Sequence, residues 1–110
     1  YNALGYSYAD RNINLEDAKK YIEVALSIAP NNHYILDSMG WLYYRLGKLD
    51  SALSFIQKAY DIQSDPEIAA HLGEILWVQG KKKEAEDIWQ LSLQSFPDNE
   101  ILKETLKRLH

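Results

Sequence analysis

Residues 36–59 read LDSMGWLYYRLGKLDSALSFIQKA, and the spacing of small residues in this segment recurs along the chain. The small residues that set the spacing are Gly40, Gly47, Ala52 and Ala59. A step of 33 positions leads from them to Gly73, Gly80, Ala85 and Ser92. A step of 34 or 35 positions in the other direction leads to Gly5, Asn12, Ala18 and Ala25. Three units of about 34 residues therefore cover roughly 1–97, which indicates a repeat architecture.

Each unit contains the signals of two helices. Gly47 and Gly80 are expected to end the first helix of their units, because glycine readily adopts the left-handed conformation that closes a helix. Asn32 and the pair Asp65-Pro66 favour the start of a first helix, as an N-terminal cap and a first-turn proline. Alanines at seven-residue spacing, such as Ala52 and Ala59, would let the two helices of a unit approach closely.

The repeat divides the chain into four parts within one expected all-α domain, 1–110. Repeat one covers 1–30, repeat two 31–64 and repeat three 65–97, and a last helix is expected over 98–110. The apolar side of this last helix would carry Ile101, Leu102, Leu106 and Leu109. Its charged side would face away from the stack and carry Lys103, Glu104, Lys107 and Arg108. Such a capping helix keeps the apolar end of a repeat stack out of water.

The pattern resembles the tetratricopeptide repeat (TPR) family. The second unit carries the consensus residues Leu36, Met39, Gly40, Tyr43, Gly47, Ala52, Ile56 and Ala59, with Ser64 in place of the consensus proline. The resemblance implies an all-α fold, a right-handed α-solenoid of three helix pairs plus the C-terminal capping helix. Because Tyr1 matches the fourth consensus position, we expect the chain to be a fragment of a longer protein with further repeats upstream.

Composition and motifs argue against several classes of function. Twelve Lys and Arg residues against 16 Asp and Glu residues make the net charge −4, which disfavours a nucleic-acid binder. The chain has no cysteine, and no apolar run approaches the ~18 residues needed to span a membrane. His33 with Asp37, and His71 with Glu74, could each supply two metal ligands, but a zinc site needs three or four. We therefore expect no enzyme, no metal site and no cofactor.

Aromatic residues on the first helix of repeat two are the most informative functional signal. At 100° per residue, its core stripe would include Leu36, Met39 and Tyr43. Tyr34 and Trp41 fall on the opposite arc with Tyr44, Asp37, Ser38 and Arg45. These aromatics either pack on neighbouring repeats or form a binding surface, since exposed aromatic patches often meet a partner.

The TPR resemblance turns this arc into a predicted site. In TPR proteins the first helices line the concave side of the superhelix. By matched position, the partner-binding groove would be lined by Asn2, Tyr6, Tyr34, Asp37, Trp41, Tyr44, Arg45, His71, Glu74 and Trp77. Tyr44 and Trp77 would form an aromatic ledge. The positions that clamp a carboxylate in some TPR proteins hold Asn2, Tyr6 and Ser38 here, so no such clamp is expected.

The predicted function is non-catalytic protein–protein interaction, in which the groove binds a peptide or helix of a partner protein. No nucleic acid and no direct membrane insertion of this fragment are expected. The alternative is a structural solenoid segment that links upstream repeats or self-associates, and the oligomeric state is left open.

A closer resemblance extends to the C-terminal repeats of proteobacterial TPR proteins. It is carried by the segments 36–41, LDSMGW, and 65–74, DPEIAAHLGE. Members of that group include envelope lipoproteins that act as adaptors of a C-terminal processing protease. The resemblance implies a bacterial source and a lipid-anchored parent on the periplasmic face of the outer membrane, with a cytoplasmic location as the alternative.

Overall fold

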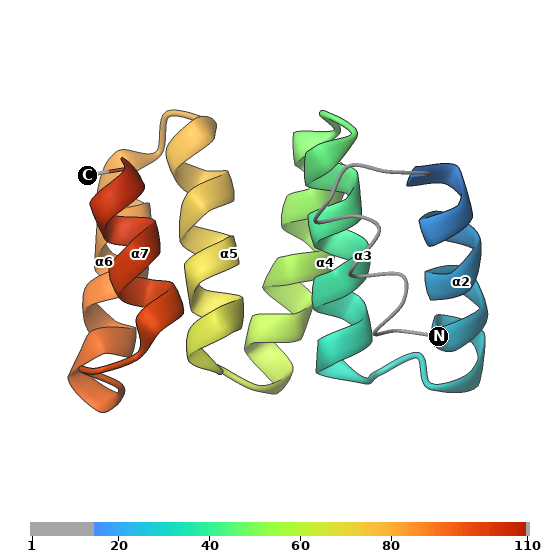
Figure 1. Ribbon diagram of the computed structural model, residues 1–110, viewed down its shortest axis with the longest axis horizontal. Coiled ribbons are helices and arrows are strands. Elements are labelled where there is room, and N and C mark those ends of the chain that lie inside the picture. Colours follow the sequence, from blue (N-terminus) through green and yellow to red (C-terminus); the bar gives the residue numbers. More distant parts are fainter. Residues whose placement is uncertain (1–14, 110) are drawn as a thin grey trace.

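The computed structural model describes residues 15–109, and every regular element over this range is an α-helix (Figure 1). The helices are α2 (Leu15–Ile28), α3 (His33–Arg45), α4 (Leu49–Ile62), α5 (Pro66–Val78), α6 (Lys82–Ser95) and α7 (Glu100–Leu109). The predicted all-α helical repeat fold is confirmed. The first helix predicted for repeat one lies outside the described residues.

The predicted start and stop residues lie at the ends of the described helices, but the side chain of Asp65, at the N-cap of α5, makes no capping hydrogen bond. Asn32 caps α3, since its side-chain oxygen accepts hydrogen bonds from the backbone N–H groups of Tyr34 and Ile35 at 3.0 and 3.1 Å. Gly47 follows α3 with a φ angle of +80°, and Gly80 follows α5 with a φ angle of +89°. Residues other than glycine rarely adopt this backbone conformation. The last helix begins at Glu100, two residues after the predicted start at residue 98. Asn99 caps it, since its side-chain oxygen accepts the backbone N–H of Leu102 at 3.0 Å.

The two helices of repeat two, and likewise those of repeat three, cross at a glycine. The most extensive helix contacts are α3 with α4 and α5 with α6. A Cβ atom on Gly40 would lie 2.2 Å from Cγ1 of Ile56, and one on Gly73 would lie 2.0 Å from Nε1 of Trp89. No side chain fits at either crossing without displacing its neighbour, which explains why the two repeats share this residue.

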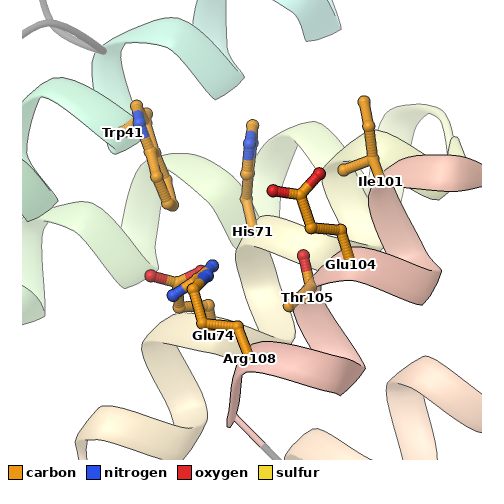
Figure 2. Close-up of a pocket in the computed structure, with 7 residues that line it drawn as sticks. All are labelled: Trp41, His71, Glu74, Ile101, Glu104, Thr105 and Arg108. Atoms are coloured by element: carbon orange, nitrogen blue, oxygen red, sulfur yellow. The ribbon is translucent and has the colours of Figure 1, made fainter.

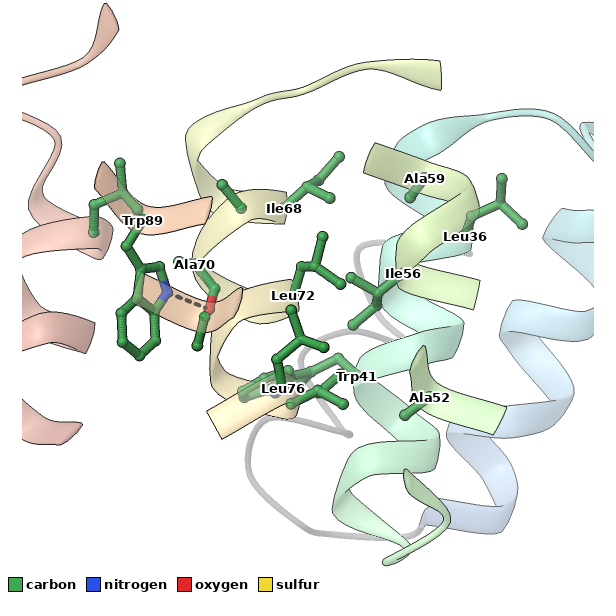
Figure 3. Close-up of a cluster of buried hydrophobic side chains, with 14 residues drawn as sticks. Leu36, Trp41, Ala52, Ile56, Ala59, Ile68, Ala70, Leu72, Leu76 and Trp89 are labelled. Carbon is green, nitrogen blue, oxygen red and sulfur yellow. Dashed lines mark hydrogen bonds between the residues drawn. The ribbon is translucent and has the colours of Figure 1, made fainter. Parts of the chain in front are cut away.

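The core continues from one repeat to the next (Figure 3). Its larger cluster joins α3, α4, α5, α6 and α7, and includes the fully buried side chains of Ile56, Leu72, Trp89 and Leu102. The indole N–H of Trp89 donates to the backbone oxygen of Ala70 at 3.4 Å, so this large side chain is buried with its polar atom satisfied. A second cluster, around Ile22 and Met39, joins α2 to α3.

The last helix packs against the third repeat. In Figure 1, α7 lies beside α5 and in front of α6, at the opposite end of the row from α2. Leu102 and Thr105 are buried, while Leu106 and Leu109 pack at the edge of the core. Ile101 departs from the predicted apolar side, since 38% of its surface is exposed.

Candidate functional site

A groove lies between α3, α5 and α7, and every residue that lines it comes from these three helices. It consists of two adjoining cavities of about 210 and 600 Å³ that share Trp41, Glu74, Glu104 and Arg108. The remaining lining residues are Tyr44, Arg45, His71, Ile101 and Thr105. Figure 2 shows Glu104 and Thr105 projecting from α7 toward the part of α5 that carries His71. We call this the α3–α5–α7 groove.

On one side of the groove, the carboxylate of Glu74 accepts hydrogen bonds from two side chains. The hydroxyl of Tyr44 donates to Oε2 of Glu74 at 2.8 Å, and Nη2 of Arg108 donates to Oε1 of the same carboxylate at 2.5 Å. Burial, together with the bond to Glu74, raises the pKa of Tyr44 well above its usual range. The hydrogen bond to Glu74 likewise raises the pKa of Arg108. The buried charge of Glu74 is thus compensated by side chains from both neighbouring helices.

A buried ion pair joins the first helices of repeats two and three. Nδ1 of His71 lies 2.9 and 3.0 Å from the two carboxylate oxygens of Asp37, and both side chains are buried. Burial lowers the pKa of His71, but the charge and hydrogen bond of Asp37 raise it by more, so the net shift is upward. Trp41 stacks on the imidazole ring with the ring centroids 4.2 Å apart.

The family follows from comparison with known proteins. The sequence model described as tetratricopeptide repeat matches residues 34–66. A curated relative, TPR repeat-containing protein PA4667 of Pseudomonas aeruginosa, is 45% identical over 108 residues, which make up 98% of this chain and 18% of the relative. The chain belongs to the TPR family.

The chain spans less than a fifth of the length of the curated relatives it matches. Besides the bacterial relative, Tetratricopeptide repeat protein 7A of Homo sapiens is 32% identical over 90 residues, which make up 81% of this chain and 10% of that protein. The higher identity to the Pseudomonas protein supports the predicted bacterial source.

Solved TPR structures share the arrangement of helices. A thermophilic TPR protein of Thermus thermophilus, TTC0263, is 26% identical, with a TM-score of 0.75 over 81% of this chain and 46% of that chain. The first TPR of Spaghetti (RPAP3), bound to an HSP90 peptide, is 18% identical and shows the same fold, with a TM-score of 0.80 over 98% of this chain and 86% of that chain. As a TPR domain, the chain is a protein–protein interaction module of a kind that is in general non-catalytic.

The predicted exposure of the TPR groove residues is wrong for Trp41. Only 8% of its surface is exposed, and it belongs to the larger core cluster. Asp37, His71 and Glu74 are buried as well. The arc of residues opposite the core stripe was derived for the first helix of repeat two in isolation. In the TPR stack α3 contacts α5, and α5 contacts α7, so these contacts cover residues of that arc. For Trp41, packing on the neighbouring repeat is therefore the correct alternative.

The other residues predicted to line the groove differ from one another in exposure and in contacts. Tyr34 and Arg45 are exposed on α3, and Tyr44 is half-buried. Trp77 pairs with Trp89 at 5.6 Å between ring centroids, and Nζ of Lys82 lies 4.9 Å from its ring. Asn2 and Tyr6 lie outside the described residues.

The ledge predicted between Tyr44 and Trp77 is not reproduced by the ring contacts of the described residues. Tyr44 pairs with Trp41 instead, at 4.8 Å.

The apolar and charged sides of the last helix did not predict the contribution of α7 to the groove. Glu104 and Arg108 are predicted to face away from the stack, but both line the groove, and Arg108 binds Glu74. The signal was present in the repeat: a further step of 34 positions from His71 and Glu74 leads to Thr105 and Arg108. The capping helix of this TPR domain therefore supplies the side chains that a following first helix would supply.

The described residues contain neither a metal cluster nor a membrane span. Over 15–109 no three His, Cys, Asp or Glu side chains are grouped to hold a metal ion. The side chains of the first candidate ligand pair have other partners: His33 lies 3.4 Å from Asp65, and Asp37 binds His71. In the second pair, His71 is bound to Asp37, and Glu74 is bound to Tyr44 and Arg108. None of helices α2 to α7 has the length and apolar character that crossing a bilayer requires.

Proposed function

We propose that the α3–α5–α7 groove binds a peptide or helical segment of a partner protein, so that the domain acts as a scaffold or adaptor. The observation that carries this proposal is the lining of the groove. It combines aromatic and aliphatic surface from Trp41, Tyr44 and Ile101 with charged side chains on two walls. Aromatic side chains with flanking polar groups are typical of surfaces where proteins bind each other.

A related solved structure supports the use of this fold for peptide binding. The first TPR of Spaghetti (RPAP3) is described as bound to the HSP90 peptide SRMEEVD. The present groove would recognise a different chemistry. Ser38, which stands at one of the carboxylate-clamp positions, is buried and donates its hydroxyl to the backbone oxygen of Tyr34 at 3.0 Å.

Selection from a random peptide library, followed by NMR, tests the proposal. The immobilised domain is used to enrich displayed peptides, and an enriched peptide is titrated into the isotope-labelled domain. We expect the largest amide shift changes on α3, α5 and α7. Changes confined to α4 and α6, or no enrichment over an empty surface, would contradict the proposal.

The structural alternative is tested by the same protein without peptide. Several apolar side chains are exposed on second helices, among them Ile28, Ile62 and Leu91. If these surfaces mediate edge-to-edge association, sedimentation velocity will show a dimer that grows with concentration. A monomer at all concentrations supports the adaptor function.

We further propose that the parent protein is an adaptor on the periplasmic face of the bacterial outer membrane. The similarity of the segments 36–41 and 65–74 to envelope TPR lipoproteins supports this location. Fractionation of the source cells, with detection of the parent by an antibody against this domain, tests it. Recovery in the cytoplasmic fraction would contradict it.

A further inference from the structure

Most charged side chains at the α3–α5–α7 groove already have partners within the fold. Glu74 is bound by Tyr44 and Arg108, and His71 is bound by Asp37. Arg45 and Glu104 differ from these lining residues in their contacts. Within residues 15–109, neither Arg45 nor Glu104 has an ion pair or a side-chain hydrogen bond, and both are exposed.

The two exposed charges stand on opposite walls of the groove. Arg45 is in the last turn of α3, and Glu104 is in the middle of α7. Both line the larger cavity, together with the paired Glu74 and Arg108. The four charges sum to zero, and the α7 wall carries both signs, since Arg108 follows Glu104 by one turn. Because Arg108 is paired with Glu74, the charges that lack an ion pair among the described lining residues are Arg45 on α3 and Glu104 on α7.

The surface between the two walls is partly apolar. Trp41 lines both cavities from α3, and Ile101 lines the smaller one from α7 with 38% of its surface exposed. Figure 2 shows Ile101 and Glu104 on neighbouring turns of α7, facing the region of Trp41 and His71. An apolar side chain of a ligand would find contact here, and burying it would supply free energy that the rim charges do not.

We propose that the partner segment is amphoteric: it carries an acidic side chain that meets Arg45, a basic side chain that meets Glu104, and an apolar residue between them. This inference rests on the proposed peptide-binding function and names the chemistry of the partner. A uniformly acidic segment would place a carboxylate against Glu104, and a uniformly basic segment would place a cation against Arg45. Opposite charges on the two walls therefore select a segment of mixed charge and set its direction in the groove.

Charge-reversal variants test the inference in a selection from a random peptide library. The wild-type domain is compared with Arg45→Glu and Glu104→Lys. The controls are Lys58→Glu on α4 and Glu23→Lys on α2, which make the same charge changes at exposed positions outside the groove. Circular dichroism confirms that all five proteins are equally helical.

We expect the wild type and both controls to enrich peptides with an acidic and a basic residue flanking an apolar one. Arg45→Glu should replace the acidic preference by a basic one, and Glu104→Lys should replace the basic preference by an acidic one. For an enriched peptide, each reversal should weaken binding about three- to tenfold at low salt, because exposed ion pairs contribute modestly. Higher salt should reduce the difference.

The possible failures are distinguishable. Peptides that bind the groove by NMR but show no charge preference, or a preference of one sign only, would overturn the amphoteric partner and leave the proposed function intact. Preferences that do not switch with the groove variants would do the same. If no peptide is enriched over an empty surface, the proposed function fails, and this inference fails with it.

Discussion

Trp41 packs on His71 and on Tyr44 at once, and these contacts make it a structural residue rather than an exposed anchor. Tyr34 is on the same helix, seven residues before Trp41, but has 52% of its surface exposed. The groove therefore presents the edge of a packed aromatic cluster to a ligand. Its accessible charges lie at the rim, on Arg45 and Glu104.

Replacing Trp41 by Ala should lower the free energy of unfolding by about 3–5 kcal/mol, the usual cost of removing a buried Trp or Phe side chain. Denaturation by urea measures this change. Tyr34→Ala is the matched control, since it removes an exposed aromatic side chain from the same helix and should leave the unfolding midpoint nearly unchanged. Equal midpoints for the two variants would show that Trp41 lies outside the core.

The pair of His71 with Asp37 predicts a dependence of stability on pH. The folded state holds the pKa of His71 above its ordinary value, so the protonated ring stabilises the fold. This stabilisation is fully present below about pH 6.5, the unfolded pKa, and is lost as the pH rises through the folded pKa. The free energy of unfolding should therefore fall over that window.

The variant His71→Asn isolates this contribution, because it removes the imidazole that pairs with Asp37 and changes no other ionisable side chain. The difference in unfolding free energy between wild type and variant should shrink as the pH is raised. A difference that stays constant as the pH rises from about 5.5 to about 9 would contradict the assignment of a raised pKa to His71.

At the scale of elements, a glycine allows the two helices of a repeat to pack closely, and polar side chains connect the first helix of a repeat to the helix that follows it in the stack. Gly73 lets α5 approach Trp89 of α6, while Glu74 in the same helix turns to the other side and binds α7. Adjacent residues of one helix thus serve two interfaces.

Gly73→Leu should lower the free energy of unfolding by about 1–3 kcal/mol or more, since a Cβ atom at this position collides with the indole of Trp89. Lys107→Leu is the control: it places the same side chain at the matching position of α7, which is exposed. Thermal unfolding followed by circular dichroism measures both. An unchanged melting temperature for Gly73→Leu would contradict the repeat register.

Arg108→Met should loosen α7. The side chain of Glu74 is only 6% exposed, and without Arg108 its charge keeps a single partner, Tyr44. We expect a loss of about 1–2 kcal/mol, toward the lower end for a half-exposed arginine. Relative to the wild type, the variant should show faster amide hydrogen exchange in α7, and a smaller increase in α3.

Lys107→Met is the adjacent control and should leave exchange in α7 unchanged. A double-mutant cycle with Glu74→Gln then isolates the pair. A coupling energy near zero would show that Arg108 stabilises α7 through packing alone.

At the scale of the whole molecule, the TPR stack is stabilised by contacts between neighbours, so its ends are the sensitive points. Removing residues 98–110 would expose the apolar surface of α5 and α6 against which Leu102 is fully buried. We expect the truncated protein to melt at a lower temperature and to associate. Size-exclusion chromatography with light scattering measures the association, and a stable monomer would contradict the capping function of α7.

Local sequence was sufficient to predict helices α2 to α7 and the pairing of α3 with α4 and of α5 with α6. Gly47 and Gly80 end helices through their own backbone conformation, and Gly40 and Gly73 recur because the two repeats have the same crossing. The groove was only partly predictable. Tyr44, Arg45 and Glu74, which the sequence proposed for the partner-binding groove, line the α3–α5–α7 groove. Their role in binding a partner stays a prediction.

The environment of each groove residue depended on tertiary structure. Trp41 is buried, and Asp37 binds His71, because α3 packs against α5. Asp37 and His71 are 34 positions apart in the sequence. Arg108 reached Glu74 because α7 occupies the place of a further first helix. Periodicity describes the sides of a single helix, whereas burial and ion pairing depend on which other helices cover each side, and that is established only by packing.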